Sequence, residues 1–289
     1  MTSTLTPPLL RAWSGLVDLA LTEDIGTGDV TSDLSIPADA AGAAHIEARQ
    51  PLVVCGLFVA REVIRRVSPE IVTTVLVDEG QSAETGQRLM ELEGKVRAIL
   101  AAERTALNFL GRLCGIATLT ARYVREVEGT SCQIVDTRKT LPGWRALDKF
   151  AVRAGGGVNH RFALYDGILL KDNHIAVAGG VEPAVKSAIQ NAPAGLRVQV
   201  EVESAEQALA ACDAGADFLL LDNCSPDEVQ EIVTRLEGRA LLEASGGITL
   251  ENVRQFAEAG VRRVSLGALT HSAPSADVAL EIARPRGAP

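Results

Sequence analysis

Residues 197–223, RVQVEVESAEQALAACDAGADFLLLDN, carry the pattern that decides the fold class of this chain. Two short apolar runs, RVQVEVE and DFLLLDN, flank a segment whose apolar residues recur at helical spacing. A strand, a helix and a second strand in this order predict two parallel strands joined by a right-handed crossover. The stretch therefore indicates an α/β fold with a parallel sheet.

The same alternation extends in both directions along the second half of the chain. We predict strands at residues 132–136, 167–172, 197–203, 217–223, 240–245 and 262–267, with helices near 181–191, 204–214, 226–237 and 249–259. These strands fit a barrel or a doubly wound sheet. Polar or glycine residues end every run: Asp136, Lys171, Asp172, Glu201, Glu203, Asp222, Ser245 and Gly267. Because active sites of α/β barrels lie at the carboxyl ends of their strands, we predict a barrel.

The first half of the chain reads differently. Residues 9–21 and 98–127 have helical spacing, and Gly111 and Gly115 either bend the second helix or allow close packing against it. Residues 75–97 predict a pair of short strands around two glycine turns, similar to the hairpins of biotinyl domains. The lysine that would carry biotin or lipoate at the hairpin tip is missing, so we interpret this likeness as structural.

Composition narrows the class of protein. The chain has 289 residues, of which 47% are hydrophobic and 3% aromatic, so its core must consist mostly of Ala, Val, Leu and Ile. The formal net charge of −9 argues against nucleic acid as a partner. No run of eighteen apolar residues and no secretory signal is visible, so we expect neither membrane insertion nor secretion. Five widely spaced cysteines without a CxxC pair predict free thiols in the cytoplasm and no structural zinc.

Residues 136–174 form a cationic segment within this acidic chain. They contain seven lysines and arginines against four aspartates, a local charge of +3. Such a segment between glycines suggests a small polyanionic ligand. Lys171 ends the apolar run GILL, where a solvated lysine is less expected. The residue type of His160 fits a structural role and a chemical role equally well.

Two glycine-containing segments follow the last two predicted strands. SGGI at 245–248 and SLGA at 265–268 each follow a strand and are expected to open a helix. Glycine permits close approach of the backbone, and a helix N-terminus offers free N–H groups to phosphate. Either segment alone could be a simple turn. Two in succession at the end of a barrel favour a phosphate site.

Acidic residues end two neighbouring strands. Glu201 and Glu203 share one face of their strand, and Asp222 ends the next strand. Buried carboxylates need a cation or hydrogen-bond donors. Mg²⁺ bound to a phosphorylated substrate, ribose hydroxyls or Lys171 could each satisfy them, and an internal salt bridge with Lys171 is the structural alternative. By spacing alone, Arg104 is a surface arginine.

Long ordered motifs resemble those of the quinolinate phosphoribosyltransferase family. The main one is DTRKTLPGWRALDKFAVRAGGGVNHRFALYDGILLKDNHI at residues 136–175. The likeness covers almost the whole chain and includes EDIGTGDVTS (23–32), ERTALNFLGRLCGIAT (103–118), EVE (201–203), LLLDN (219–223), EASGGI (243–248) and LGALTHS (266–272).

The resemblance implies an architecture and an activity. We expect an N-terminal α/β sandwich-like domain, residues 1–115 with the returning segment 270–289, and an incomplete, open α/β barrel of about six to seven parallel strands at residues 116–269. The implied reaction converts quinolinate and phosphoribosyl pyrophosphate, with Mg²⁺, to nicotinate mononucleotide, pyrophosphate and CO₂. The family works as a homodimer with shared active sites.

The resemblance also implies roles for individual residues. Arg104 matches the arginine that the partner subunit lends to the site. The cationic substrate pocket matches Thr137, Arg138, Lys139, His160, Arg161 and Lys171. Glu201 and Asp222 match acids near the ribose hydroxyls and Mg²⁺, so the catalytic set would be Lys139, Lys171, Glu201 and Asp222. The 5′-phosphate loops match Ser245, Gly246 and Gly247, with Leu266, Gly267 and Ala268.

The chain departs from the family pattern at three positions, and two other functions remain open. Ala163 replaces a glycine, and Gly111 and Cys114 stand where Gln and Ser are more usual. None of these positions belongs to the charged pocket. The first alternative is a related enzyme, such as the molybdenum-operon paralogue or one for another pyridine carboxylate. The second is a non-catalytic phosphosugar-binding protein.

Overall fold

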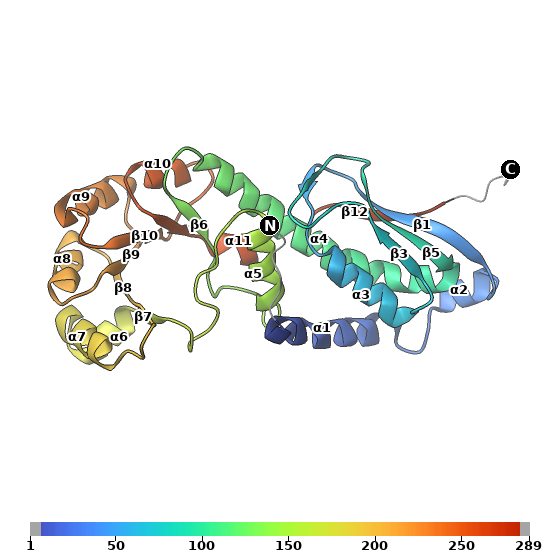
Figure 1. Cartoon of the computed structure of the whole chain (residues 1–289), viewed down its shortest axis with the longest axis horizontal. Coiled ribbons are helices and arrows are strands. Elements are labelled where there is room, and N and C mark those ends of the chain that lie inside the picture. The colour runs from blue at the N-terminus through green and yellow to red at the C-terminus, as the bar shows by residue number, and fades with distance from the viewer. Residues whose placement is uncertain (1–6, 284–289) are drawn as a thin grey trace. The chain divides into compact units, whose positions relative to one another are not determined.

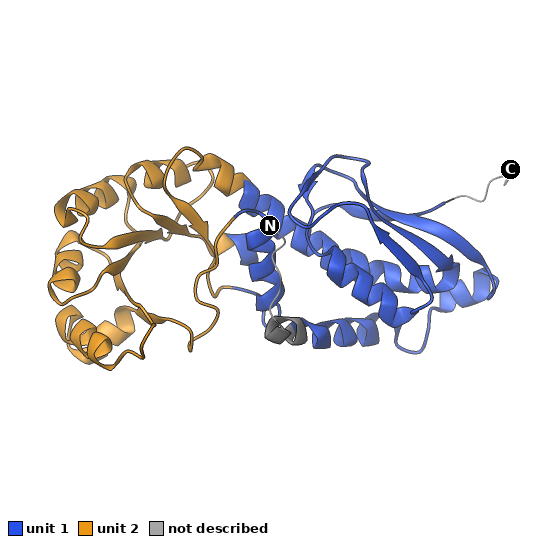
Figure 2. Cartoon of the chain, viewed as in Figure 1, with its two compact units in different colours: residues 1–121, 140–156, 269–289 blue, residues 122–139, 157–268 orange. Residues whose placement is uncertain are grey.

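The computed structural model describes residues 7–283 (Figure 1). Its two larger sheets differ in strand direction, because one is antiparallel and the other is parallel. The described chain divides into two units (Figure 2). Unit 1 comprises residues up to 121, residues 140–156 and residues from 269 onward, and unit 2 comprises residues 122–139 and 157–268. No helix of the described chain is both long enough and apolar enough to span a bilayer.

Unit 1 contains an antiparallel sheet in the order β12-β1-β5-β3. Its strands are β1 (Ala41–Ala48), β3 (Val72–Val75), β5 (Arg88–Lys95) and β12 (Val278–Ile282). Strand β12 pairs with β1 in the register Ile46↔Leu280, so the end of the described chain returns to the first sheet. On β1, Ala44, Ile46 and Ala48 are buried while the residues between them are more exposed, as expected when one face of a sheet is covered.

The predicted strand pair at residues 75–97 is confirmed in part, because Val75 at the end of β3 pairs with Met90 of β5 across two glycine turns. The stretch contributes β4 (Ser82–Ala83) and all of β5, but β4 pairs with β2 (Leu52–Val53), and β5 also pairs with β1. Local turn signals indicated the strands and the pairing of β3 with β5, whereas the partners β1 and β2 come from earlier parts of the chain.

The helices of unit 1 confirm both helical predictions for the first half of the chain. They are α1 (Pro7–Ile25), α2 (Val30–Ser35), α3 (Leu57–Val67) and α4 (Val96–Glu126), whose last residues enter unit 2. Both glycines of α4 serve close packing. The N–H of Ala276 donates to the carbonyl oxygen of Gly111 at 2.8 Å, and a Cβ on Gly115 would lie 2.0 Å from the oxygen of Pro274.

Cys114, one of the departures from the family pattern, is fully buried on α4. Its Sγ accepts from the N–H of Cys55 at 3.2 Å and donates to the oxygen of Cys55 at 3.3 Å. Burial raises the pKa of the Cys114 thiol to about 12, so this sulfur is a structural hydrogen-bonding group.

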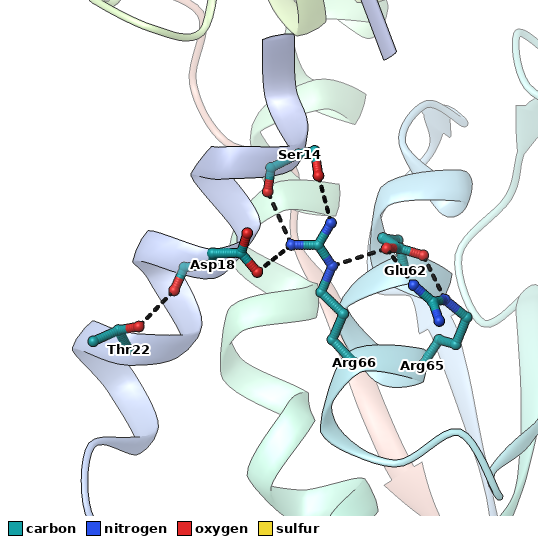
Figure 3. A network of polar contacts seen from close by, with 6 residues as sticks. All are labelled: Ser14, Asp18, Thr22, Glu62, Arg65 and Arg66. Atoms are coloured by element: carbon teal, nitrogen blue, oxygen red, sulfur yellow. Dashed lines mark hydrogen bonds and ion pairs between the residues drawn. The ribbon is translucent and has the colours of Figure 1, made fainter. Parts of the chain in front are cut away.

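A polar network joins α1 to α3 (Figure 3). The Arg66 guanidinium donates to the oxygen of Ser14 at 3.0 Å and to its Oγ at 2.6 Å, and also pairs with Asp18. Its Nε donates to Glu62 at 2.8 Å, and Arg65 donates to the same carboxylate. Hydrogen bonds from Arg65 and Arg66 lower the pKa of Glu62 to about 2, so this carboxylate stays ionised at neutral pH.

Unit 2 is built on a parallel sheet in the order β6-β11-β10-β9-β8-β7. The strands are β6 (Gln133–Val135), β7 (Ile168–Leu170), β8 (Val198–Val202), β9 (Phe218–Asp222), β10 (Leu241–Ser245) and β11 (Arg263–Ser265). The first strand pairs with the last, as in a barrel, and Val158 bridges Val135 on the other side of β6. The described chain shows no ladder between Val158 and β7, so the barrel is open there. The six predicted strands and the incomplete barrel are confirmed.

The helices between the strands of unit 2 are α6 (Asp172–Ala178), α7 (Val181–Asn191), α8 (Ala205–Asp213), α9 (Pro226–Leu236) and α10 (Val253–Glu258), and α11 (Ala268–His271) follows the last strand and continues into unit 1. Ser204 and Ser225 start α8 and α9, because their side-chain oxygens accept from backbone N–H groups of the first turn. The short helix α6 was not predicted. Helix α10 begins at Val253 instead of residue 249, because residues 250–252 form a turn.

Helix α5 (Arg145–Ala154) lies in unit 1, although the predicted barrel spans residues 116–269. Phe150 meets Phe58 edge-to-face at a ring-centroid distance of 5.0 Å. Trp144, the residue before α5, stacks on Phe109 at 4.7 Å. These aromatic contacts attach residues 140–156 to the first unit.

Candidate active site

Ionisable side chains gather at the carboxyl ends of the parallel strands. Lys171 follows β7, Glu201 lies near the end of β8, and Asp222 ends β9. The Lys171 Nζ lies 3.0 Å from the Glu201 Oε2. Parallel strands end at the same edge of a sheet, which explains how residues thirty positions apart come into contact.

Asp222 experiences the charge of the whole cluster. Burial raises its pKa, and the neighbouring carboxylates of Glu201 and Glu203 raise it further. The ammonium groups of Lys171 and Lys139 act in the opposite direction. The structure therefore brings Lys139, predicted from the strand before the cationic loop, into the electrostatic neighbourhood of this cluster.

Arg138 and Arg161 are also neighbours. Burial lowers the pKa of Arg161, and the like charge of Arg138 lowers it further. The Arg161 Nη1 donates to the oxygen of Gly167 at 2.9 Å. The like charges of these two guanidinium groups act on each other, which favours a ligand with more than one negative charge.

The turn after Arg161 explains why Ala163 is tolerated. The Asp166 carboxylate accepts from the N–H of Phe162 at 2.6 Å and from the N–H of Ala163 at 2.7 Å. Ala163 contributes its backbone to this turn, and any residue with an N–H group can do so.

His160 and Arg161 line a cavity of about 250 Å³ together with Arg197 and Arg263. Ile168, Phe218 and Arg263, the first residues of β7, β9 and β11, also border it, so the cavity lies at the amino ends of these strands. The structure thus groups Arg161 with Arg138 and with this cavity. The backbone N–H of His160 donates to the Asp136 Oδ1 at 2.9 Å, and its ring Nε2 lies 2.9 Å from the Gln199 Oε1.

The first glycine segment has the predicted backbone freedom, but it does not open a helix. Gly246 and Gly247 have φ values of 92° and 61°. A Cβ on Gly246 would lie 2.1 Å from the Asn223 Oδ1, whereas a Cβ on Gly247 would meet no atom within 4 Å. Helix α10 begins only at Val253, because Asn252 accepts from the N–H of Thr249 at 2.7 Å and closes a turn first.

The second glycine segment follows the prediction more closely. Helix α11 begins at Ala268, directly after Leu266 and Gly267. The N–H of Leu266 donates to the oxygen of Val135 at 2.9 Å, which fixes this loop beside β6. On the adjoining loop, the Thr137 Oγ1 accepts from the N–H of Lys139 at 3.0 Å and shapes the turn that carries Arg138.

Arg104 lies on α4 with 64% of its side chain exposed. Its Nη2 is 3.9 Å from the carboxylate of Glu103, a weak contact for an ion pair. Within unit 1 this arginine is a solvent-facing group, as its spacing indicated.

Comparison with known proteins identifies the family. A family model described as "Quinolinate phosphoribosyl transferase, N-terminal domain" matches residues 29–114, and its C-terminal counterpart matches residues 116–281. The chain belongs to the quinolinate phosphoribosyltransferase family.

Relatives of this family match nearly the whole chain. The nicotinate-nucleotide pyrophosphorylase [carboxylating] of Mycobacterium leprae is 42% identical over 269 residues, covering 91% of this chain and 94% of its own. Quinolinate phosphoribosyltransferase [decarboxylating] 1b of Nicotiana tabacum is 36% identical over 288 residues, covering 93% and 81%. The solved nicotinate-nucleotide pyrophosphorylase of Francisella tularensis has a TM-score of 0.90 at 38% identity, covering 94% and 96%.

Two polar residues, one in and one next to the quinolinate phosphoribosyltransferase motifs, were missed as site residues from sequence. Gln199 on β8 is 2% exposed, and Glu243 on β10 is fully buried. Both are polar residues within apolar runs, RVQVEVE and ALLEAS, and this interruption is the signal that could have found them. A buried polar side chain in a strand needs a partner, and here both lie at His160.

Proposed function

We propose that this chain converts quinolinate and phosphoribosyl pyrophosphate to nicotinate mononucleotide, pyrophosphate and CO₂ in the biosynthesis of NAD. The observation that carries the proposal is the match of both halves of the chain to this family, together with the lysine–carboxylate cluster at the strand ends. The relatives bear names for this activity. As such an enzyme, the chain is a pentosyltransferase.

The neighbouring guanidinium groups of Arg138 and Arg161 suit the dicarboxylate. Quinolinate carries two negative charges at neutral pH, and arginine binds carboxylates through a bidentate fork. A dianion relieves the repulsion that lowers the pKa of Arg161. Nicotinate, with one carboxylate, would compensate only half of this charge.

The carboxylates of Glu201 and Asp222 suit the ribose. The ring nitrogen of quinolinate displaces pyrophosphate at C1 of the ribose through an oxocarbenium-like state, whose positive charge nearby carboxylates stabilise. Lys171, 3.0 Å from Glu201, holds that carboxylate in place. The ring carboxylate beside the nitrogen then leaves as CO₂, its bonding electrons are accepted by the pyridinium ring, and a proton takes its place. No nucleophilic side chain is needed.

Mg²⁺ is part of the proposal as a metal held jointly with the substrate. Among residues 7–283 no group of three or more His, Cys, Asp or Glu side chains could hold a metal ion. Two carboxylates, Glu201 and Asp222, fit the habit of Mg²⁺ to bind one or two protein carboxylates and the substrate phosphates. Bound there, Mg²⁺ would neutralise the charge of the departing pyrophosphate.

We assign the 5′-phosphate to the glycine loops Ser245–Gly247 and Leu266–Ala268. The positive φ values of Gly246 and Gly247 turn the backbone sharply after β10, and the space beside Gly247 leaves its surroundings open to a ligand. Backbone N–H groups in such loops bind phosphate without a charged side chain.

An activity assay with quinolinate, phosphoribosyl pyrophosphate and Mg²⁺ tests the proposal. We expect nicotinate mononucleotide and CO₂ in equal amounts, and their absence would contradict the proposal and favour the paralogue or the phosphosugar-binding protein.

Arg138→Ala should raise KM for quinolinate by roughly tenfold or more, with KM for phosphoribosyl pyrophosphate within about threefold. Arg239→Ala, which removes an exposed ion pair with Asp213, is the control and should leave both KM values unchanged. An equal loss of thermal stability in Arg138→Ala would indicate a structural role instead.

We also propose a homodimer in the cytoplasm whose active sites share Arg104. Support comes from the exposed position of Arg104 and from the five free cysteine thiols. An equal mixture of Arg104→Ala and Lys171→Ala subunits should recover about a quarter of the wild-type activity. About half of the randomly paired dimers are heterodimers, and one of the two sites in each heterodimer then has neither substitution. Confirmed heterodimers without any activity would refute the shared site.

A further inference from the structure

A buried polar cluster surrounds the imidazole of His160. Its ring Nε2 lies 2.9 Å from the Gln199 Oε1 and 3.5 Å from the Glu243 Oε1. The N–H of Arg161 donates to the Nδ1 of the same ring at 2.8 Å. Gln199 and Glu243 come from strands β8 and β10, and His160 follows the bridge residue Val158.

These contacts determine which ring nitrogen carries the proton. An Nδ1 that accepts from the Arg161 N–H has no proton of its own. The proton of the neutral ring is therefore on Nε2, where it is donated to the Gln199 Oε1. Glu243, an acceptor when ionised, lies on the same side and favours the same tautomer.

Glu243 depends on this ring. Its side chain is fully buried, and neither carboxylate oxygen has a hydrogen-bond partner in the described part of the chain. The Nε2–H of His160 at 3.5 Å is the donor nearest to the carboxylate among the recorded contacts. Buried polar groups with so little compensation are costly and call for a functional explanation.

The cluster lies on the same face of the sheet as the active-site carboxylates. Glu201 and Glu243 are both in register with Leu220 of the strand between them. Gln199, two residues before Glu201, shares its face because side chains alternate along a strand. Glu243 therefore lies level with Glu201, and Gln199 lies one layer closer to the amino ends of the strands.

The imidazole also anchors residues 159–161, which the strand ladder of the sheet does not include. Val158 makes an isolated bridge to Val135, and residues 159–161 lie outside the ladder. Asp136 fixes this segment from the β6 side, accepting from the N–H of His160 and from the Asn159 side chain. On the other side the ring connects the N–H of Arg161 to β8 and β10.

We propose that Gln199 and Glu243 are positioning residues for the dicarboxylate substrate. They fix His160 as its Nε2–H tautomer, so that its Nδ1 holds the Arg161 backbone and keeps that guanidinium beside Arg138 against their mutual repulsion. His160 accordingly serves as a bridge inside the protein and transfers no proton to the substrate. The inference rests on the proposed function, which supplies quinolinate as the ligand.

Steady-state kinetics test the proposal through the split between the two substrates. Gln199→Met removes one buried hydrogen bond to the ring and should raise KM for quinolinate by roughly tenfold. Glu243→Met removes the carboxylate 3.5 Å from Nε2 and should have a similar effect, and KM for phosphoribosyl pyrophosphate should stay within about twofold in both variants. Glu243→Gln keeps an acceptor oxygen at the same place and should stay within about threefold of wild type. Equal changes of both KM values, or no rescue by Glu243→Gln, would overturn the proposal.

A double substitution tests whether Gln199 acts through the ring. In a His160→Phe background, Gln199→Met should change KM for quinolinate by less than about twofold, because the bridge is already broken. A further tenfold rise would mean that Gln199 acts independently of His160, which contradicts the proposal.

The tautomer can be measured without any enzyme activity. Nitrogen-15 NMR of the histidine rings distinguishes a protonated from an unprotonated ring nitrogen. The chain has four histidines, so replacing His45, His174 and His271 identifies His160 by elimination. We expect a protonated Nε2 and a bare Nδ1 in the free protein. A protonated Nδ1 would refute the bridge even if the protein is active. Conversely, the protein could show the expected spectrum and yet bind no quinolinate. That result would support the histidine bridge and refute the proposed function.

Discussion

Replacing Lys171 with methionine is expected to lower kcat/KM for the phosphoribosyl transfer by roughly 10²–10³-fold, as for the loss of one preorganised charge in an active site. Methionine keeps the length of the apolar stem, so the change removes mainly the ammonium group. That group lies 3.0 Å from the Glu201 Oε2, and the Glu201 side chain is only 10% exposed. Without it, Glu201 loses its partner and Asp222 loses a charge that lowers its pKa. Both carboxylates would then stabilise the positive charge that develops on the ribose less effectively.

The measurement is kcat/KM together with the melting temperature. Because the Lys171 side chain is 48% exposed, we expect Tm to change by no more than about 3 °C. Lys186→Met is the matched control. Its Nζ lies 2.6 Å from Glu182 within α7, and both side chains are more than 60% exposed. This control should keep kcat/KM within about twofold of wild type. A large fall in Tm with little loss of kcat/KM in Lys171→Met would indicate that the ion pair is structural.

Arg112→Met is expected to lower the free energy of unfolding of unit 1 by about 3–5 kcal/mol, as when one partner of a buried ion pair is removed. Arg112 on α4 donates through Nε and Nη2 to both carboxylate oxygens of Asp148, at 3.1 and 2.9 Å. Its Nη2 also donates to the oxygen of Thr270 at 2.9 Å, and its guanidinium lies 5.4 Å from the Trp144 ring centroid. One side chain thereby connects α4 to α5 and to the returning segment of the chain.

The expected loss of stability is large because the Asp148 carboxylate stays buried after the guanidinium is removed. Its side chain is fully buried, and the substitution removes two charge-assisted hydrogen bonds and the positive charge that faces this carboxylate. Both tryptophans of the chain, Trp13 and Trp144, belong to unit 1, so fluorescence during urea unfolding reports on this unit. Arg235→Met, which breaks exposed pairs with Glu206 and Glu231, is the control and should change the free energy by less than about 1 kcal/mol. Similar values for the two variants would contradict a structural role for the Arg112–Asp148 pair.

Periodicity made the parallel strands predictable. Each buried strand of unit 2 is a short apolar run ended by a polar or glycine residue, and β6 to β11 all lie within the predicted ranges. Segment 75–97 shows where the same reasoning stops. Its residues indicate strands and turns, but the pairing of β4 with β2 and of β5 with β1 is decided by the packing of distant segments. The start of α10 was missed for a local reason, since the Asn252 side chain closes a turn that apolar spacing does not reveal.

The site was predictable to the extent that it consists of charged residues at strand ends. Lys171, Glu201 and Asp222 each end a run, and their grouping follows from the parallel sheet. The role of His160 could not be read in this way. Its ring is bound by Gln199 and Glu243, which are 39 and 83 positions away and whose neighbours are apolar.

By itself, the sequence determined the class of fold, the positions of the barrel strands and the identity of the charged groups at their ends. These properties depend on local spacing and on residue type, which need no knowledge of distant contacts. Only the tertiary structure decided that β6 pairs with β11, that α5 belongs to unit 1 and that the imidazole of His160 is a buried bridge. Each of these depends on which distant surfaces meet, because pairing partners, aromatic contacts and a tautomer are set by the atoms that approach and not by their order along the chain.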